Sequence, residues 1–257
     1  ELREINPLAM IEYYVTKEKI SQGEDGAINF YPTEPKGSEE ELAQIKDLLG
    51  SCNTNFRTSV ASRITNINVA TSRINGTVLY PGEVFSVNET ILYRNKENGY
   101  EKAGSYEGGQ TVQSYGGGVC QVSTTLYNAV IYAELEIVER QNHSMTVAYV
   151  PLAMDAAIAG DYLDFKFKNN QEYPIYIEGY TQGKDLYFNI YGVETRPANR
   201  TIEFETTVLE TMDPGTMFTA VELPVGTVTQ TQSKHIGYRT QLWKIVKEDG
   251  VVVSKEK

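Results

Sequence analysis

The sequence is poor in the residues that build covalent or metal-held scaffolds. Its 257 residues include two cysteines, two histidines and one tryptophan. Two cysteines cannot form a disulfide framework, and a four-ligand zinc finger would need every cysteine and histidine in the chain. A single disulfide between Cys52 and Cys120 is compatible with this count, so the redox compartment stays open.

Long apolar runs and an excess of positive charge are also missing. No stretch of about 18 apolar residues exists, so we expect no transmembrane helix within the chain. The chain carries 34 acidic and 23 basic residues, a net charge of −11, which excludes the concentrated positive face that a nucleic-acid partner requires. With 40% hydrophobic and 22% charged residues, the composition indicates an ordinary globular protein. The start at Glu1, without an initiator methionine, leads us to expect a trimmed or mature fragment.

The spacing of apolar residues predicts three helices. The first covers residues 38–50, has acidic residues in its first turn and ends at Gly50. The second lies within residues 57–75 and stops before the turn signal Asn75-Gly76. The third begins at Cys120 and presents one apolar face to the core.

The remaining pattern indicates strands and a division into parts. Strands are predicted at 77–80, 137–140, 144–150, 164–168, 174–180 and 186–191, with the last two forming a hairpin, and 93–109 is predicted to be a loop. We therefore expect an α+β fold: a core of mixed helices and antiparallel sheet, followed by a small all-β module. The expected divisions are a linker or tail of a preceding domain at 1–37, the core at 38–196 and the module at 197–257.

The glycine run Gly116–Gly118 directly precedes Cys120. Three glycines cost backbone entropy, so they indicate a close backbone approach or unusual φ angles. At the start of a helix, free N–H groups and the positive end of the dipole stabilise a thiolate and lower a thiol pKa to roughly 3.5–7.5. The same N–H groups, near Gly118–Gln121, suit an oxyanion. The plainer alternative is that Cys120 is a small buried apolar residue.

Two further residues complete a candidate catalytic site. His143 follows the third helix and its next strand, which can return past Cys120 and place the imidazole where it accepts the thiol proton. Asp155 would orient that imidazole, and Asp161 and Asp164 are rivals for this role. The order Cys, His, Asp along helix, strand and strand is that of papain-like and transglutaminase-like cores, an analogy of fold order alone. A catalytic Zn²⁺ held by the same three residue types is the alternative, and no cofactor is otherwise expected.

Four ordered motifs resemble the VanW family. They are Asn75–Ser86, Gly116–Asn128, Glu139–Ser144 and Asp164–Asn170, and the likeness extends over roughly residues 50–192. Within this resemblance the Gly-Gly-Gly-x-Cys-Gln motif falls on Gly116–Gln121, and the His-Ser and Asp-Ala pairs begin at His143 and Asp155. Residues 200–257 are similar to the five-glycine (G-five) domain, whose last strand or turn we expect beyond Lys257.

The resemblance implies an exported protein of Gram-positive bacteria, outside the cell and associated with the wall. Its expected partner is peptidoglycan or a glycan that contains N-acetylglucosamine, with membrane contact only through an anchor outside this chain. We expect Cys120, His143 and Asp155 to be catalytic in thiol-dependent acyl transfer or amide hydrolysis of wall peptides. Substrate binding is expected at Gly116, Gly117, Gly118, Gln121 and Ser144. The alternative is a non-catalytic glycan-binding or scaffold protein, in which the glycines line a groove and Cys120 is packed.

Overall fold

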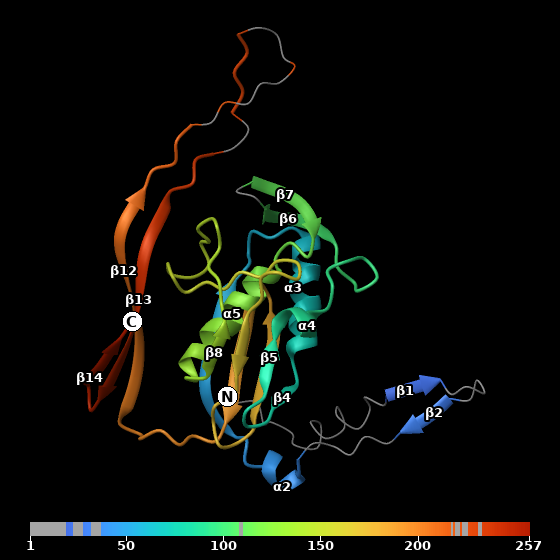
Figure 1. Ribbon diagram of the computed structural model, residues 1–257, viewed down its shortest axis with the longest axis vertical. Coiled ribbons are helices and arrows are strands. Elements are labelled where there is room, and N and C mark those ends of the chain that lie inside the picture. Colours follow the sequence, from blue (N-terminus) through green and yellow to red (C-terminus); the bar gives the residue numbers. More distant parts are fainter. Residues whose placement is uncertain are drawn as a thin grey trace.

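The computed structural model describes residues 19–22, 28–31, 37–107, 110–216, 218, 222, 226–230 and 233–257. The fold is α+β, as predicted, with helices set against antiparallel sheets (Figure 1). In chain order it begins with the hairpin β1 (Lys19–Gln22) and β2 (Ile28–Tyr31) and the single turn α2 (Glu39–Leu42). Most of the predicted linker at 1–37 lies outside the described residues.

The core is a four-stranded antiparallel sheet with two helices packed against it. The strand order is β3 (Asp47–Asn55), β11 (Asp185–Gly192), β10 (Ile175–Gln182) and β4 (Thr77–Leu79). Helix α3 (Ala61–Ile74) contacts β10, helix α5 (Val119–Tyr132) contacts β3 and β11, and the two helices contact each other. Alternate residues of β11, such as Phe188, are fully buried, as a strand with one face on the core requires.

Smaller elements surround this core. A three-stranded sheet pairs β5 (Val84–Ser86), β9 (Lys166–Lys168) and β8 (Glu136–Glu139), and the short helix α4 (Val87–Ile91) follows β5. The hairpin of β6 (Lys102–Glu107) and β7 (Gln110–Tyr115) leads into α5. In the part of the chain that the structure describes, no helix is long and apolar enough to cross a membrane.

Helix α5 is central to the fold. The sequence predicts one apolar face, whereas the structure buries almost the whole helix, including its polar residues. The sheet strands β3 and β11 cover one side, and backbone of the irregular segment 153–165 bonds to residues on α5. Its N-terminal end, with Cys120, is therefore enclosed by several parts of the chain.

Three local predictions are wrong, each for a tertiary reason. The helix predicted for 38–50 ends at Leu42, and the following residues form β3 because they pair with β11. Gly50 does not stop a helix; a Cβ there would lie 2.4 Å from the Ala129 carbonyl oxygen of α5, so its strand needs glycine. The predicted loop 93–109 contains β6, and residues 144–150 form no strand. The predicted helices at 57–75 and from Cys120, and the hairpin before residue 192, are confirmed.

A third sheet follows the core. It consists of β12 (Arg200–Met212), β13 (Gly237–Glu248) and β14 (Val251–Glu256) and lies beside the core sheet (Figure 1). Three cations from residues 196–244 converge on Glu134 at the C-terminal end of α5: Arg196, Arg200 and Lys244. The chain is thus held at Arg196, where the predicted core ends. That residues 197–257 form a separate module stays a prediction.

Candidate active site

Cys120 is the second residue of α5, and the helix is capped by Gly118 in a left-handed conformation with φ of 111°. The thiol donates a hydrogen bond of 3.3 Å to the carbonyl oxygen of Ile158. The disulfide that the cysteine count left open is not formed: both Cys52 and Cys120 are free thiols, and Cys52 lies on β3 opposite Phe188. Cys120 is thus available for chemistry at the start of a helix.

A polar stripe on α5 holds the segment that carries the acid of the site. Hydrogen bonds join every fourth residue of the helix to every second residue of the segment: Asn128 Nδ2 to the Met154 carbonyl (2.7 Å), Thr124 Oγ1 to the Ala156 carbonyl (3.2 Å), and Cys120 Sγ to the Ile158 carbonyl. Four helical residues rise about 6 Å and two extended residues about 6.6 Å, so the two repeats stay in step. The segment therefore runs antiparallel along the helix toward Cys120.

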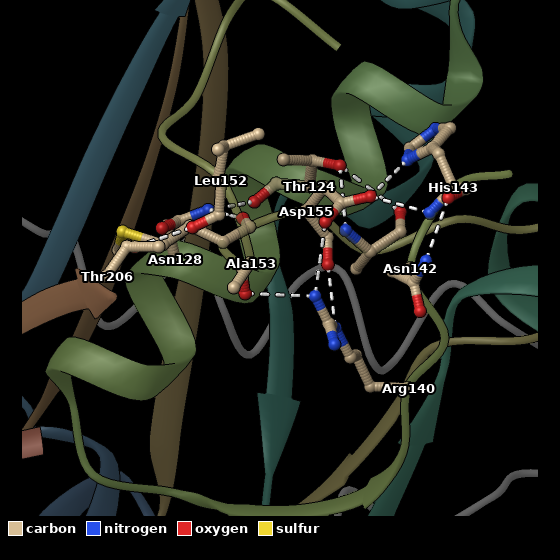
Figure 2. A network of polar contacts seen from close by, with 11 residues as sticks. Thr124, Asn128, Arg140, Asn142, His143, Leu152, Ala153, Asp155 and Thr206 are labelled. Atoms are coloured by element: carbon tan, nitrogen blue, oxygen red, sulfur yellow. Dashed lines mark hydrogen bonds and ion pairs between the residues drawn. The ribbon is translucent and has the colours of Figure 1, made fainter. Parts of the chain in front are cut away.

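Asp155 lies on this segment and is joined to His143 twice (Figure 2). Its Oδ2 is 2.7 Å from His143 Nδ1 and accepts a 2.6 Å bond from the His143 backbone N–H. The other carboxylate oxygen accepts from Arg140 Nη2 at 3.2 Å, and Arg140 also donates to the carbonyls of Ala153 and Asp155. Only 9% of the His143 side chain and 11% of the Asp155 side chain are exposed. The imidazole is thereby held in one orientation.

The three predicted residues are brought together in the order Cys120, His143, Asp155: His143 is held by Asp155, and Cys120 and His143 lie close enough for each to shift the pKa of the other. Because Nδ1 faces Asp155, Nε2 is the ring nitrogen left for the sulfur. His143 and Asp155 both lie in the irregular chain between β8 and β9, not on the strands that the papain-like order predicts. That order of elements stays an analogy.

The electrostatics favour a charged pair of thiolate and imidazolium. Burial raises the pKa of Cys120, but His143, the Ile158 backbone and Arg94 together hold that pKa below its ordinary value. Burial lowers the pKa of His143, but the interactions with Asp155 and Cys120 raise it to about 9. Burial opposes the charge on Asp155 as well, yet His143 and Arg140 keep the pKa of its carboxyl low. The shifts of Cys120 and His143 both act toward a thiolate and an imidazolium.

The glycine run is explained by packing within the chain. A Cβ on Gly117 would lie 2.7 Å from the carbonyl oxygens of Ala103 and Gly104 on β6. Gly116 and Gly118 have φ of 82° and 111°, which disfavour other residues. The predicted substrate contacts of Gly116, Gly117 and Gly118 are therefore not needed to explain why glycine stands there.

The two other predicted substrate-binding residues differ from each other. Gln121 is 1% exposed. Its side-chain Nε2 donates to Thr54 Oγ1 and to the Asn55 carbonyl, and its Oε1 accepts from Arg63. Its side chain is thus committed to the fold. Ser144 is exposed beside His143, on the wall of a cleft between residues 142–153 and the β12–β13 hairpin.

The backbone N–H groups at the start of α5 are not equivalent. Those of Val119 and Gln121 donate to the carbonyls of Gly116 and Gly118. Within the described ranges, no backbone carbonyl accepts from the N–H of Gly118 or of Cys120. In the predicted stretch, these are the two N–H groups left for an oxyanion.

The rivals of Asp155 have other surroundings. Asp164 is buried and accepts from Ser86 Oγ (2.6 Å) and the Asn88 N–H, so it holds the start of α4. Asp161 is exposed. Over the described residues, no group of three or more His, Cys, Asp or Glu is arranged to hold a metal ion.

Sequence reasoning missed the residues that support the site. Arg140 precedes His143 by three residues, and nothing in its surroundings in the sequence marks it as a partner of Asp155. Thr124 and Asn128 were detectable, because they follow Cys120 by four and eight residues and so lie on the same face of the predicted helix. Tyr149 was also missed: burial raises its pKa, and the charge of Cys120 adds to the effect.

Comparison with known proteins finds relatives of this chain. The chain is 38% identical over 165 residues to "Uncharacterized protein YoaR" of Bacillus subtilis (strain 168), a match that covers 64% of this chain and 54% of that protein. It is 26% identical over 116 residues to "Vancomycin B-type resistance protein VanW" of Enterococcus faecalis (strain ATCC 700802 / V583), covering 43% of this chain and 42% of that protein. The chain thus spans about half the length of the curated relatives it matches, and no solved structure matches it.

The family model described as "VanW like protein" matches residues 62–191, which is half of the chain and includes Cys120, His143 and Asp155. The β12–β14 sheet lies beyond this match, so the likeness to a G-five domain stays a prediction. On the extent of the family match, this chain belongs to the VanW family.

Proposed function

We propose that this protein uses Cys120 as the nucleophile of a thiol-dependent acyl transferase or amide hydrolase. The observation that carries the proposal is the position of His143, whose ring is held by Asp155 and whose interaction lowers the pKa of the Cys120 thiol. Its support is geometric and electrostatic: the sulfur is at a helix N-terminus, the imidazole is fixed by a carboxylate, and the charges favour the thiolate.

The reaction follows the triad logic. The Cys120 thiolate attacks the carbonyl carbon of an amide, and the Cys120 backbone N–H donates to the developing oxyanion. His143 gives its proton to the leaving amine, and a thioester to Cys120 remains. An incoming amine or water then attacks the thioester and passes a proton to His143, which restores the thiolate and imidazolium and releases the new amide or acid.

The proposed substrate is a peptide of the cell wall, and the proposed location is outside the cell. Support for both comes from membership of the VanW family and from a relative that is named as a vancomycin B-type resistance protein. A peptidoglycan stem peptide supplies amides of the required kind, and wall glycan is the proposed second partner of residues 197–257.

The first test measures the nucleophile directly. Cys120 is alkylated with iodoacetamide at pH 6 and compared with a free thiol such as glutathione. Cys52 serves as the internal comparison, because burial raises its pKa to about 11. Alkylation of Cys120 that is at least about tenfold faster than that of glutathione supports the activated thiolate. A rate no faster than that of glutathione contradicts it.

The second test measures the reaction. Purified muropeptides are incubated with the protein, and products are identified by mass spectrometry. Cys120→Ser removes the thiolate while it keeps a small side chain at the same position, so we expect loss of every new product. The non-catalytic alternative makes the opposite prediction: Cys120→Ala leaves muropeptide binding and the biological phenotype unchanged, and the protein yields no product.

A further inference from the structure

Two arginines lie against the glycine run that leads to Cys120. A Cβ on Gly118 would lie 2.9 Å from Cγ of Arg63, which is on α3. A Cβ on Gly116 would lie 2.5 Å from Cγ of Arg94, which lies between α4 and β6. The two side chains therefore approach the start of α5 from two separate elements of the fold.

Among the side chains that the structure describes, the hydrogen-bond partners of both arginines are neutral. Arg63 donates to Ser59 Oγ (2.6 Å) and Gln121 Oε1 (2.8 Å). Arg94 donates to Asn88 Oδ1 (2.9 Å) and to the carbonyl oxygen of Gly160 (3.2 Å).

All four acceptors are neutral, and no carboxylate of the described residues lies within ion-pair distance of either guanidinium. A guanidinium has five N–H groups, so each arginine keeps three beyond these bonds. Both side chains are half-buried, where an uncompensated cation is costly.

Both positive charges act on the sulfur. Arg94 is among the groups that lower the pKa of Cys120, and the negative charge of Cys120 acts to raise the pKa of Arg63 against the larger effect of burial. The protein as a whole carries a net charge of −11. Arg63 and Arg94 nevertheless add positive charge beside Cys120.

We propose that Arg63 and Arg94 form an anion subsite beside Cys120 that binds a carboxylate of the peptide substrate. The inference rests on the proposed role of Cys120 as nucleophile and narrows its substrate class to peptides with a free carboxylate close to the amide that is cleaved or transferred. Arginine suits this task because its planar fork binds a carboxylate through paired hydrogen bonds. The carboxylate supplies the negative charge that the fold leaves out.

The experiment compares two alkylating probes of nearly equal size. Iodoacetate carries a carboxylate, whereas iodoacetamide is neutral, and both react with the thiolate, so the thiol pKa cancels from the ratio of their rates. The Cys52→Ala background leaves Cys120 as the only thiol. We expect Arg63→Gln and Arg94→Gln each to lower the ratio of iodoacetate to iodoacetamide rates by about fivefold. Arg63→Lys, which keeps the charge, is expected to restore part of the ratio.

Arg57→Gln is the matched control, because Arg57 is exposed and its charge is screened by solvent. A ratio that changes no more in Arg63→Gln and Arg94→Gln than in Arg57→Gln overturns the subsite. Slow alkylation of Cys120 by both probes would instead contradict the activated thiolate, so the two proposals fail in different ways.

A measurement on the unaltered chain covers variants that do not fold. Phenylglyoxal modifies arginines, and the modified positions are mapped by mass spectrometry with and without N-acetylglycine, a small carboxylate. Protection of Arg63 and Arg94 but not of Arg57 supports the subsite. Equal modification with N-acetylglycine and with its neutral amide overturns it.

Discussion

Glu134 joins the C-terminal sheet to the end of the helix that carries Cys120 through ion pairs. Removing its charge tests how much these ion pairs contribute to stability. Its carboxylate accepts from Arg200 Nη2 at 2.8 Å and from Lys244 Nζ at 2.5 Å, and Arg196 joins them at 3.3 Å. Only 12% of its side chain is exposed. Its backbone has a φ of 58°, a left-handed conformation that is unusual for a residue with a side chain. Glu134→Gln keeps the shape and removes the charge.

The pKa of Glu134 sets the magnitude. Burial opposes its charge, but the bonds and charges of Arg200 and Lys244 lower the pKa from 4.5 to about 2. At a pH where the carboxyl is ionised in both the folded and the unfolded protein, such a shift corresponds to about 3 kcal/mol of unfolding free energy. The cations reach solvent, which screens part of the interaction, so we expect Glu134→Gln to cost about 2 kcal/mol at pH 7.

The assay is urea unfolding at several pH values. Because the folded pKa is depressed, the contribution of Glu134 is complete above pH 4.5 and is lost as the pH falls toward 2, so the two proteins should converge there. Glu205→Gln is the matched control: its ion pair with Lys255 is exposed, and we expect a cost below about 0.5 kcal/mol. Equal costs for Glu134→Gln and Glu205→Gln, or a Glu134→Gln cost that does not change with pH, would refute the reasoning.

Three further predictions concern the site. His143→Ala removes the group that holds the Cys120 pKa low, so the pH midpoint of iodoacetamide alkylation should move upward and the rate at pH 6 should fall by about tenfold or more. Asp155→Asn removes the carboxylate that raises the His143 pKa to about 9; titration of the imidazole by NMR should give a value at least about one unit lower, and an unchanged value would count against the contact. Gly117→Ala places a methyl group 2.7 Å from two β6 carbonyl oxygens and should lower the unfolding free energy by about 2 kcal/mol, measured by thermal unfolding. An unchanged unfolding free energy would mean that β6 can shift away from the methyl group at no cost.

Local signals in the sequence were sufficient where the outcome depends on near neighbours. The helix from Cys120 and the hairpin around residue 183 follow from periodicity and turn residues alone, and both are present. The helix predicted for 38–50 failed because Leu48 and Leu49 satisfy a helical period equally well, whereas pairing with β11 places them in a strand. Pairing with a strand far along the chain cannot be detected from a short stretch of sequence.

The same division holds at the site. The sequence by itself determined that a cysteine follows a glycine run at a helix start, and that one histidine and a few acids come soon after. Only the tertiary structure decided among the acids: Asp155 reaches His143 because its segment runs in step with the polar stripe of α5, while Asp164 is used at α4. The tertiary structure also showed what the glycines pack against: β6 and two arginine side chains lie where a Cβ would be. Spacing along a chain fixes which groups lie on one element, but the distance between elements depends on how their side chains pack.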